Sequence, residues 1–239
     1  MKLQKETESP KGTAEGKHGR WYGDACGTAF ALELVGERWS LLIVRELMMG
    51  GRRFSDLRRV LPGISAKVLT ERLAGLEAAG VLKKRQIADP VPAQVYELTE
   101  WGYYAEVAIR ELGRWAARSP LHDPSLPLTP VGLMLSMRTL IDPEKAKAFD
   151  AVIGFEVAGE SFVAELKDGQ LPIRRSSSLG DPSSAQVIFR APAGPVVAAA
   201  LYGKLPIAEV EAEMGLKVEG DRELAERYIG LFALPEKIV

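Results

Sequence analysis

The chain has 239 residues, a formal net charge of −1, one cysteine and two histidines. This length accommodates one large domain or two ordinary ones. A single cysteine excludes an internal disulfide framework, and two histidines far apart in the sequence argue against a zinc site, so no metal is expected. No segment approaches the roughly 18 apolar residues of a membrane span, and no apolar signal region follows the N-terminal lysines. We therefore expect a soluble, cytoplasmic protein without a membrane partner.

The charges are distributed unevenly along the chain. Residues 52–85 carry nine Lys and Arg against three Asp and Glu, a net +6, whereas residues 119–239 carry twelve basic and seventeen acidic side chains, a net −5. A basic first half beside an acidic second half indicates that only the first half meets a polyanion.

Residues 1–20 are charged and lack periodicity, which predicts a disordered tail. Asp24 and Ser55 are the expected caps of the first and third helices, because a side-chain oxygen there can accept a free backbone N–H. Three helices are expected in this part of the chain, over residues 24–36, 39–48 and 56–60.

A longer helix is predicted over residues 64–80. Ser65 is its expected N-cap, and Gly80 ends it. Three leucines recur at i, i+4 and i+7 and form one apolar stripe: Leu69, Leu73 and Leu76. The opposite side is mostly small or hydrogen-bonding, which suits close approach to base edges in a major groove. A solvated amphipathic helix is the alternative, and the segment that follows decides between the two.

That segment predicts a two-stranded ribbon. Residues 81–87 and 94–98 have strand character, and a Pro- and Asp-containing turn, residues 88–93, separates them. The first strand carries three consecutive cations, which suit contacts to phosphates: Lys83, Lys84 and Arg85. Helices followed by such a ribbon indicate a winged helix-turn-helix domain, which we place at residues 21–118.

The next helix, residues 99–118, begins at the capping hydroxyl of Thr99. It carries six large apolar side chains: Tyr103, Tyr104, Val107, Ile109, Leu112 and Trp115. It is too apolar for a solvated helix, so we expect it to pack on another chain or on the second domain.

A Pro-rich linker, residues 119–128, precedes a second domain at residues 129–239. Asp168-Gly169 is a strong signal for a tight hairpin. We expect strands over residues 148–157, 161–167, 170–175, 185–190 and 216–219, and helices over residues 130–140, 193–202, 206–214 and 221–232. This order predicts an α+β domain with an antiparallel sheet.

Several motifs of the first half resemble HxlR-type winged helix-turn-helix regulators of bacteria. They are Cys26, A-L-E-L-V-G-E-R-W-S-L-L-I-V-R-E-L, R-R-F-S-D-L, P-G-I-S-A-K-V-L-T-E-R-L, L-E-A-A-G-V-L and Y-E-L-T-E-W-G. The resemblance implies a homodimer whose two reading helices enter successive major grooves of a near-palindromic operator in double-stranded DNA. It implies base contacts from Ser65, Lys67, Thr70 and Arg72, and backbone contacts from Arg52, Arg53, Arg58, Arg59, Lys83, Lys84 and Arg85.

Cys26 occupies the position of a cysteine that senses oxidants or electrophiles in some members of that family, so it is a candidate redox sensor. Gly27 replaces the proline often found next, and no neighbour in the sequence obviously lowers the pKa of the thiol. The alternative is a buried free cysteine that acts as a small apolar side chain.

The second half is similar to sterol-carrier-protein domains in the segments F-E-V, S-F-V-A-E-L-K-D-G-Q-L-P-I, V-V-A-A-A-L-Y-G and L-K-V-E-G-D. This resemblance implies a cavity for an apolar ligand between sheet and helices. Its candidate lining is Leu133, Met137, Phe155, Phe162, Leu201 and Phe232. Ordinary core packing of these six side chains is the alternative.

No catalytic constellation is evident, because neither His18 nor His122 has a nucleophile partner in the sequence. We expect neither enzymatic activity nor a cofactor. Two functions remain. One is a DNA-binding transcriptional regulator whose second domain senses an apolar ligand or supports dimerisation. The other is a lipid or small-molecule carrier that uses the winged helix for protein contacts. The net +6 of residues 52–85 favours the regulator.

Overall fold

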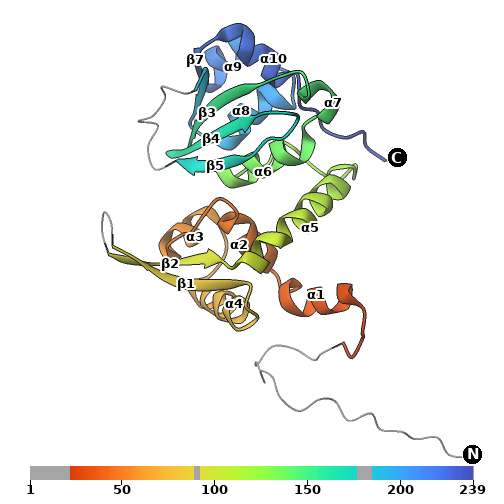
Figure 1. Cartoon of the computed structure of the whole chain (residues 1–239), viewed down its shortest axis with the longest axis vertical. Helices are drawn as coiled ribbons and strands as arrows, with labels where there is room; N and C mark the ends of the chain where they lie inside the picture. The colour runs from red at the N-terminus through yellow and green to blue at the C-terminus, as the bar shows by residue number, and fades with distance from the viewer. Residues whose placement is uncertain (1–21, 89–91, 177–184, 239) are drawn as a thin grey trace, which may run out of the picture.

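The computed structural model describes residues 22–88, 92–176 and 185–238, and it consists of two parts joined by a long helix and a linker (Figure 1). The expected N-terminal tail, residues 1–20, lies outside the described residues. The first part contains α1 (Gly27–Val35), α2 (Ser40–Leu47), α3 (Phe54–Val60), α4 (Ala66–Ala78), the antiparallel ribbon of β1 (Leu82–Ile87) and β2 (Ala93–Leu98), and α5 (Glu100–Ala117).

This order confirms the winged helix-turn-helix layout expected from the sequence. The leucine stripe of α4 is buried in the core of this part, where α4 packs on α2. Two expected caps are wrong. The cap position of α1 is Cys26 rather than Asp24, and α3 begins at Phe54, so that Ser55 lies inside it. Arg52 and Tyr96 exchange both backbone hydrogen bonds, at 2.9 and 2.8 Å, which holds Arg52 extended until the helix begins.

The second part opens with α6 (Pro130–Leu140) and the short helix α7 (Pro143–Ala146). The strands are β3 (Ala151–Val157), β4 (Glu160–Leu166), β5 (Ile173–Ser176), β6 (Val187–Ala191) and β7 (Lys217–Gly220), and the remaining helices are α8 (Gly194–Leu201), α9 (Ile207–Met214) and α10 (Arg222–Ile229). The five strands form one sheet in the order β5-β4-β3-β6-β7. A mixed α+β fold with a sheet is therefore confirmed.

The expected antiparallel sheet is wrong at one pairing, because β3 and β6 run parallel, with Phe155 opposite Phe189. β5 lies at the far edge beyond β4, and β6 pairs with the other edge of β3. Because β6 joins after the chain has crossed from one edge to the other, no local turn signal sets its direction. The remaining pairings in this sheet are antiparallel.

Two local features of the second part have clear causes. The tight hairpin at Asp168-Gly169 is confirmed: both residues have positive φ, 50° and 74°, and Lys167 and Gln170 exchange backbone hydrogen bonds at 3.0 and 2.8 Å. Such paired positive φ values are typical of the tight turns that Asp-Gly favours. The unexpected helix α7 is capped by Asp142, whose carboxylate accepts hydrogen bonds from the backbone N–H groups of Glu144 and Lys145.

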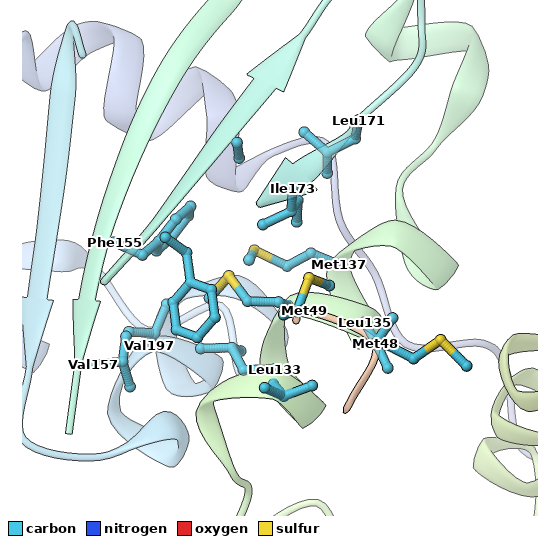
Figure 2. Packing of buried hydrophobic residues seen from close by; sticks show 14 of the residues in the cluster. Met48, Met49, Leu133, Leu135, Met137, Phe155, Val157, Leu171, Ile173 and Val197 are labelled. Carbon is cyan, nitrogen blue, oxygen red and sulfur yellow. The ribbon is translucent and has the colours of Figure 1, made fainter. Parts of the chain in front are cut away.

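The buried apolar side chains of the two parts form one continuous cluster. Figure 2 shows Met48 and Met49, which follow α2, beside Leu135 and Met137 of α6. The two parts therefore share a core, which ties their relative placement to hydrophobic burial as well as to the linker.

Candidate nucleic-acid interface

α4 presents a polar face to solvent at its N-terminal end. The Oγ atom of Ser65 accepts a hydrogen bond from the backbone N–H of Val68 at 3.2 Å, so Ser65 is the N-cap, as expected. Lys67 and Thr70 are exposed on the side opposite the leucine stripe. The hydroxyl of Thr70 donates to the carbonyl of Ala66 at 2.9 Å and keeps its acceptor lone pairs.

Arg72 lies on the same helix but is held by another element. Its Nη2 atom is 3.0 Å from Oε2 of Glu37, which precedes α2, and only 16% of its side chain is exposed. A base contact by Arg72 therefore requires it to exchange the Glu37 carboxylate for DNA.

The ribbon places its three cations in solvent beside α4 (Figure 1). Nζ of Lys84 is 2.5 Å from Oε2 of Glu77 on α4, and Nε of Arg85 is 2.6 Å from Oε2 of Glu97 on β2. The hydrogen bond to Glu77 raises the pKa of the Lys84 amine, which keeps it charged. Lys83 makes no ion pair with any residue that the structure describes.

The arginines before α4 fall into two groups. Arg58 and Arg59 are exposed on α3, and Arg53 is half-buried at its start. Arg52 is only 3% exposed, and its Nη2 atom lies 2.8 Å from Oε2 of Glu160 on β4. The expected phosphate contact by Arg52 is therefore not available in this arrangement, since its guanidinium joins the two parts of the molecule.

The centre of this junction is the buried carboxylate of Glu46 on α2. Its Oε1 atom accepts hydrogen bonds from Nη2 of Arg45 at 2.8 Å and from the hydroxyl of Thr129 at 2.7 Å. Its Oε2 atom lies 3.4 Å from Nη2 of Arg52. A buried carboxylate needs such partners, and Thr129, the N-cap of α6, ties the linker to the first part.

Cys26 is exposed, so the alternative of a buried apolar cysteine is wrong. Hydrogen bonds from the backbone of Thr28 and Ala29 at the start of α1, and then from the side chain of Thr28, lower the pKa of its thiol. Sequence reasoning missed this cause, because it depends on where α1 begins.

α1 and α5 carry large apolar side chains in solvent. None of the α1 side chains is fully buried, and α1 projects away from the rest of the first part (Figure 1). The exposed apolar residues of the two helices are Phe30, Leu32, Trp101, Tyr103, Tyr104, Val107, Leu112 and Trp115. Trp115 is the most exposed of them, at 73%. α5 also packs on α6, but of the six apolar side chains expected to make such a contact only Ile109 packs against the core, and the other five are exposed.

The model of the HxlR-like helix-turn-helix family matches residues 34–122. The uncharacterized HTH-type transcriptional regulator YvaP of Bacillus subtilis is 38% identical over 87 residues, which are 36% of this chain and 80% of YvaP. The chain belongs to the HxlR-like helix-turn-helix family.

Two further matches are also named as transcriptional regulators. The uncharacterized HTH-type transcriptional regulator YtfH of Escherichia coli is 38% identical over 101 residues, 41% of this chain and 79% of YtfH. The reduced form of the regulator YodB from B. subtilis is 32% identical, covers 41% of this chain and 98% of that one, and has a TM-score of 0.37. The match to the family model covers α2 to α5 and ends at residue 122, within the linker.

The six ligand-pocket candidates of this HxlR-like chain lie in packed core. Each is at most 1% exposed: Leu133, Met137, Phe155, Phe162, Leu201 and Phe232. Figure 2 shows three of them, Leu133, Met137 and Phe155, in close packing. None lines the cavity of about 730 Å³ that the structure contains at the junction of its two parts.

Two further observations concern the part of the chain that the structure describes. None of its helices combines the length and the apolar character needed to cross a bilayer. No group of three or more His, Cys, Asp or Glu side chains there is arranged to hold a metal ion.

Proposed function

We propose that this HxlR-like protein is a transcriptional regulator that binds a near-palindromic operator as a homodimer. The observation that carries the proposal is the exposed polar N-terminal end of α4, on a helix whose C-terminal part contacts the basic ribbon. In this arrangement Ser65, Lys67 and Thr70 read base edges in the major groove. The cations of the ribbon hold the helix in register through phosphates.

The exposed apolar faces of α1 and α5 support dimerisation. Isolated helices shorter than about 12–15 residues are marginal in water, and α1 has 9 residues without a fully buried side chain. A second copy of the chain that covers α1 and the outer face of α5 would stabilise both helices. The symmetric dimer then presents two copies of α4 to half-sites one helical turn apart, ~34 Å.

Oxidation or alkylation of Cys26 is proposed to regulate the same dimer. Cys26 lies at the start of α1, where hydrogen bonds lower the pKa of its thiol, and thiolate is the reactive form. Oxidation or alkylation at this position would act next to the proposed dimer surface, where an added group changes packing.

For the second part we propose a regulatory role, with either an apolar ligand or support of the dimer as its means. Its resemblance to sterol-carrier domains supports the first of these. The alternative, a lipid or small-molecule carrier that uses the winged helix for protein contacts, is less favoured, because the relatives YvaP and YtfH are named as transcriptional regulators.

An electrophoretic mobility assay separates the two functions. DNA from upstream of the protein's own gene is compared with a scrambled duplex of the same length and composition. We expect upstream DNA to bind at least ~10³-fold more tightly at physiological salt, as specific regulators do. Equal affinity for both duplexes, or no binding, would favour the carrier.

A further inference from the structure

The cavity at the junction is built by both parts of the chain. Its walls come from α5, the linker, α6, α8 and the residues around Met214 and Leu234, and its volume is about 730 Å³. Ligand pockets for small organic molecules typically measure about 300–1,000 Å³ and are mostly apolar. The lining includes one apolar side chain from each of these four elements: Ile109 from α5, Leu128 from the linker, Leu135 from α6 and Ala199 from α8. Neither part alone forms this site.

One side of α5 lines the cavity, and nearly the opposite side is the proposed dimer surface. Residues on a helix are about 100° apart, so Ile109, Gly113 and Ala117, which line the cavity, lie on one side. Val107 and Trp115, which are exposed, lie on nearly the opposite side. A second copy of the chain on the exposed side therefore leaves the cavity accessible.

A few polar groups interrupt the apolar wall. The hydroxyls of Ser136 and Tyr202 are 2.7 Å apart, and burial raises the pKa of Tyr202 so far that its phenol stays neutral. Arg45 and Arg110 also line the cavity, and a guanidinium group carries hydrogen-bond donors only. An acceptor oxygen on a bound molecule would pair with such donors.

We propose that this cavity is an effector site for a compact, mostly apolar organic molecule that carries an acceptor oxygen, and that its occupancy changes the affinity for DNA. The inference rests on the proposed regulatory function. The six core residues considered above take no part in the site.

The position of the cavity explains how an effector acts. Arg45 lines the cavity and hydrogen-bonds to Glu46 on α2, and Leu128 lines it next to Thr129, which also hydrogen-bonds to Glu46. A bound molecule that moves the linker or α6 therefore also moves groups that contact α2. Because α2 packs on α4, the displacement can reach the reading helix. The molecule changes the affinity for DNA only if it binds the DNA-competent and the DNA-incompetent arrangements with different affinity.

The test uses the full-length protein and the fluorescent probe 1-anilinonaphthalene-8-sulfonate, which has fused apolar rings and sulfonate oxygens. Gly113→Phe and Ala199→Phe fill the cavity from its two sides. An added Cβ at Gly113 meets no atom within 4 Å, so there is room for the larger side chain. Ala208→Phe, on the exposed face of α9, is the matched control.

We expect the probe to saturate one site per chain. Each cavity variant should bind it at least tenfold more weakly while keeping a cooperative melting curve, and Ala208→Phe should match the wild type throughout. Because coupling is reciprocal, operator DNA must change the affinity for the probe by the same factor, ~5- to 150-fold, by which the probe changes the affinity for DNA.

Probe binding that does not saturate, or that neither cavity variant weakens, would overturn the site. Saturable binding in the cavity without any effect on operator affinity would overturn its regulatory role. The probe titration needs no DNA, so failure to bind any operator would overturn the proposed function while the cavity result is judged separately.

Discussion

At the scale of single residues, the proposed complex gives Lys67 and Lys83 different roles. Lys67 is exposed on α4, whereas Lys83 is exposed on β1 without an ion pair among the described residues. The first faces the groove in the proposed complex, and the second faces the backbone. Their substitutions should therefore have different signatures.

Lys67→Ala should lower the preference for operator over random DNA, by ~1–3 kcal/mol if Lys67 contacts a base. Lys83→Ala should weaken binding to all sequences and reduce the salt slope by about 0.9. Fluorescence anisotropy at several salt concentrations measures both, with Lys217→Ala on the exposed part of β7 as the control. If both variants bind like this control, the assignment of α4 and the ribbon is wrong.

The thiol of Cys26 should react at lower pH than an ordinary cysteine. Its pKa is lowered, first by the backbone hydrogen bond from Thr28, so the thiolate is populated below the usual ~8.5. Iodoacetamide alkylation rates measured against pH should have their midpoint below that value. Thr28→Val removes only the contribution of the side chain and should raise the midpoint part of the way. A wild-type midpoint at or above ~8.5 would contradict this account.

At the scale of elements, local signals predicted the ribbon and the described helices other than α7. The stripe Leu69, Leu73 and Leu76 predicted the buried side of α4, and the hydroxyls of Ser65 and Thr99 predicted two helix starts that the structure confirms. The parallel pairing of β3 with β6 was not predictable in this way, because it joins strands that are distant in the sequence. The cavity was not predictable for the same reason. Its walls come from elements that are distant in the sequence and lie together only in the folded structure.

The apolar surface of α1 and α5 predicts that a charge placed there separates the dimer. Val107 is 68% exposed on the outer side of α5, so Val107→Glu costs the monomer little but would bury a carboxylate in the dimer. Light scattering should give twice the chain mass of 26.0 kDa for the wild type and the single mass for the variant. Lys217→Glu is the control for an added acidic group. A wild-type mass of one chain at micromolar concentration would contradict the proposed dimer.

The contact between α6 and α2 should contribute measurably to stability. Thr129→Val removes the hydroxyl that donates to Glu46 and caps α6. The buried carboxylate then loses a donor, so the free energy of unfolding should fall by ~1–3 kcal/mol. Thr129→Ser keeps the hydroxyl and should recover most of the loss. Urea denaturation measures both, and equal stability of Thr129→Val and the wild type would show that this contact carries little weight.

At the scale of the whole molecule, the shared core and the ion pairs of Arg52 join a DNA-binding part to a part that the HxlR-like family model does not cover. The basic residues 52–85 and the acidic residues 119–239 are segregated between these parts. In the proposed complex the acidic part lies away from the DNA, where it does not oppose the attraction to phosphates. In this proposal the second part regulates binding without contacting DNA itself.

Nuclease footprinting on DNA upstream of the protein's own gene tests the central claim most directly. A dimer that reads DNA with two copies of α4 should protect two related half-sites whose centres lie about 10–10.5 base pairs apart, on the same face of the duplex. The Val107→Glu monomer should lose this protection at the same concentration. Protection of a single half-site, or none at concentrations that saturate the mobility shift, would contradict the account.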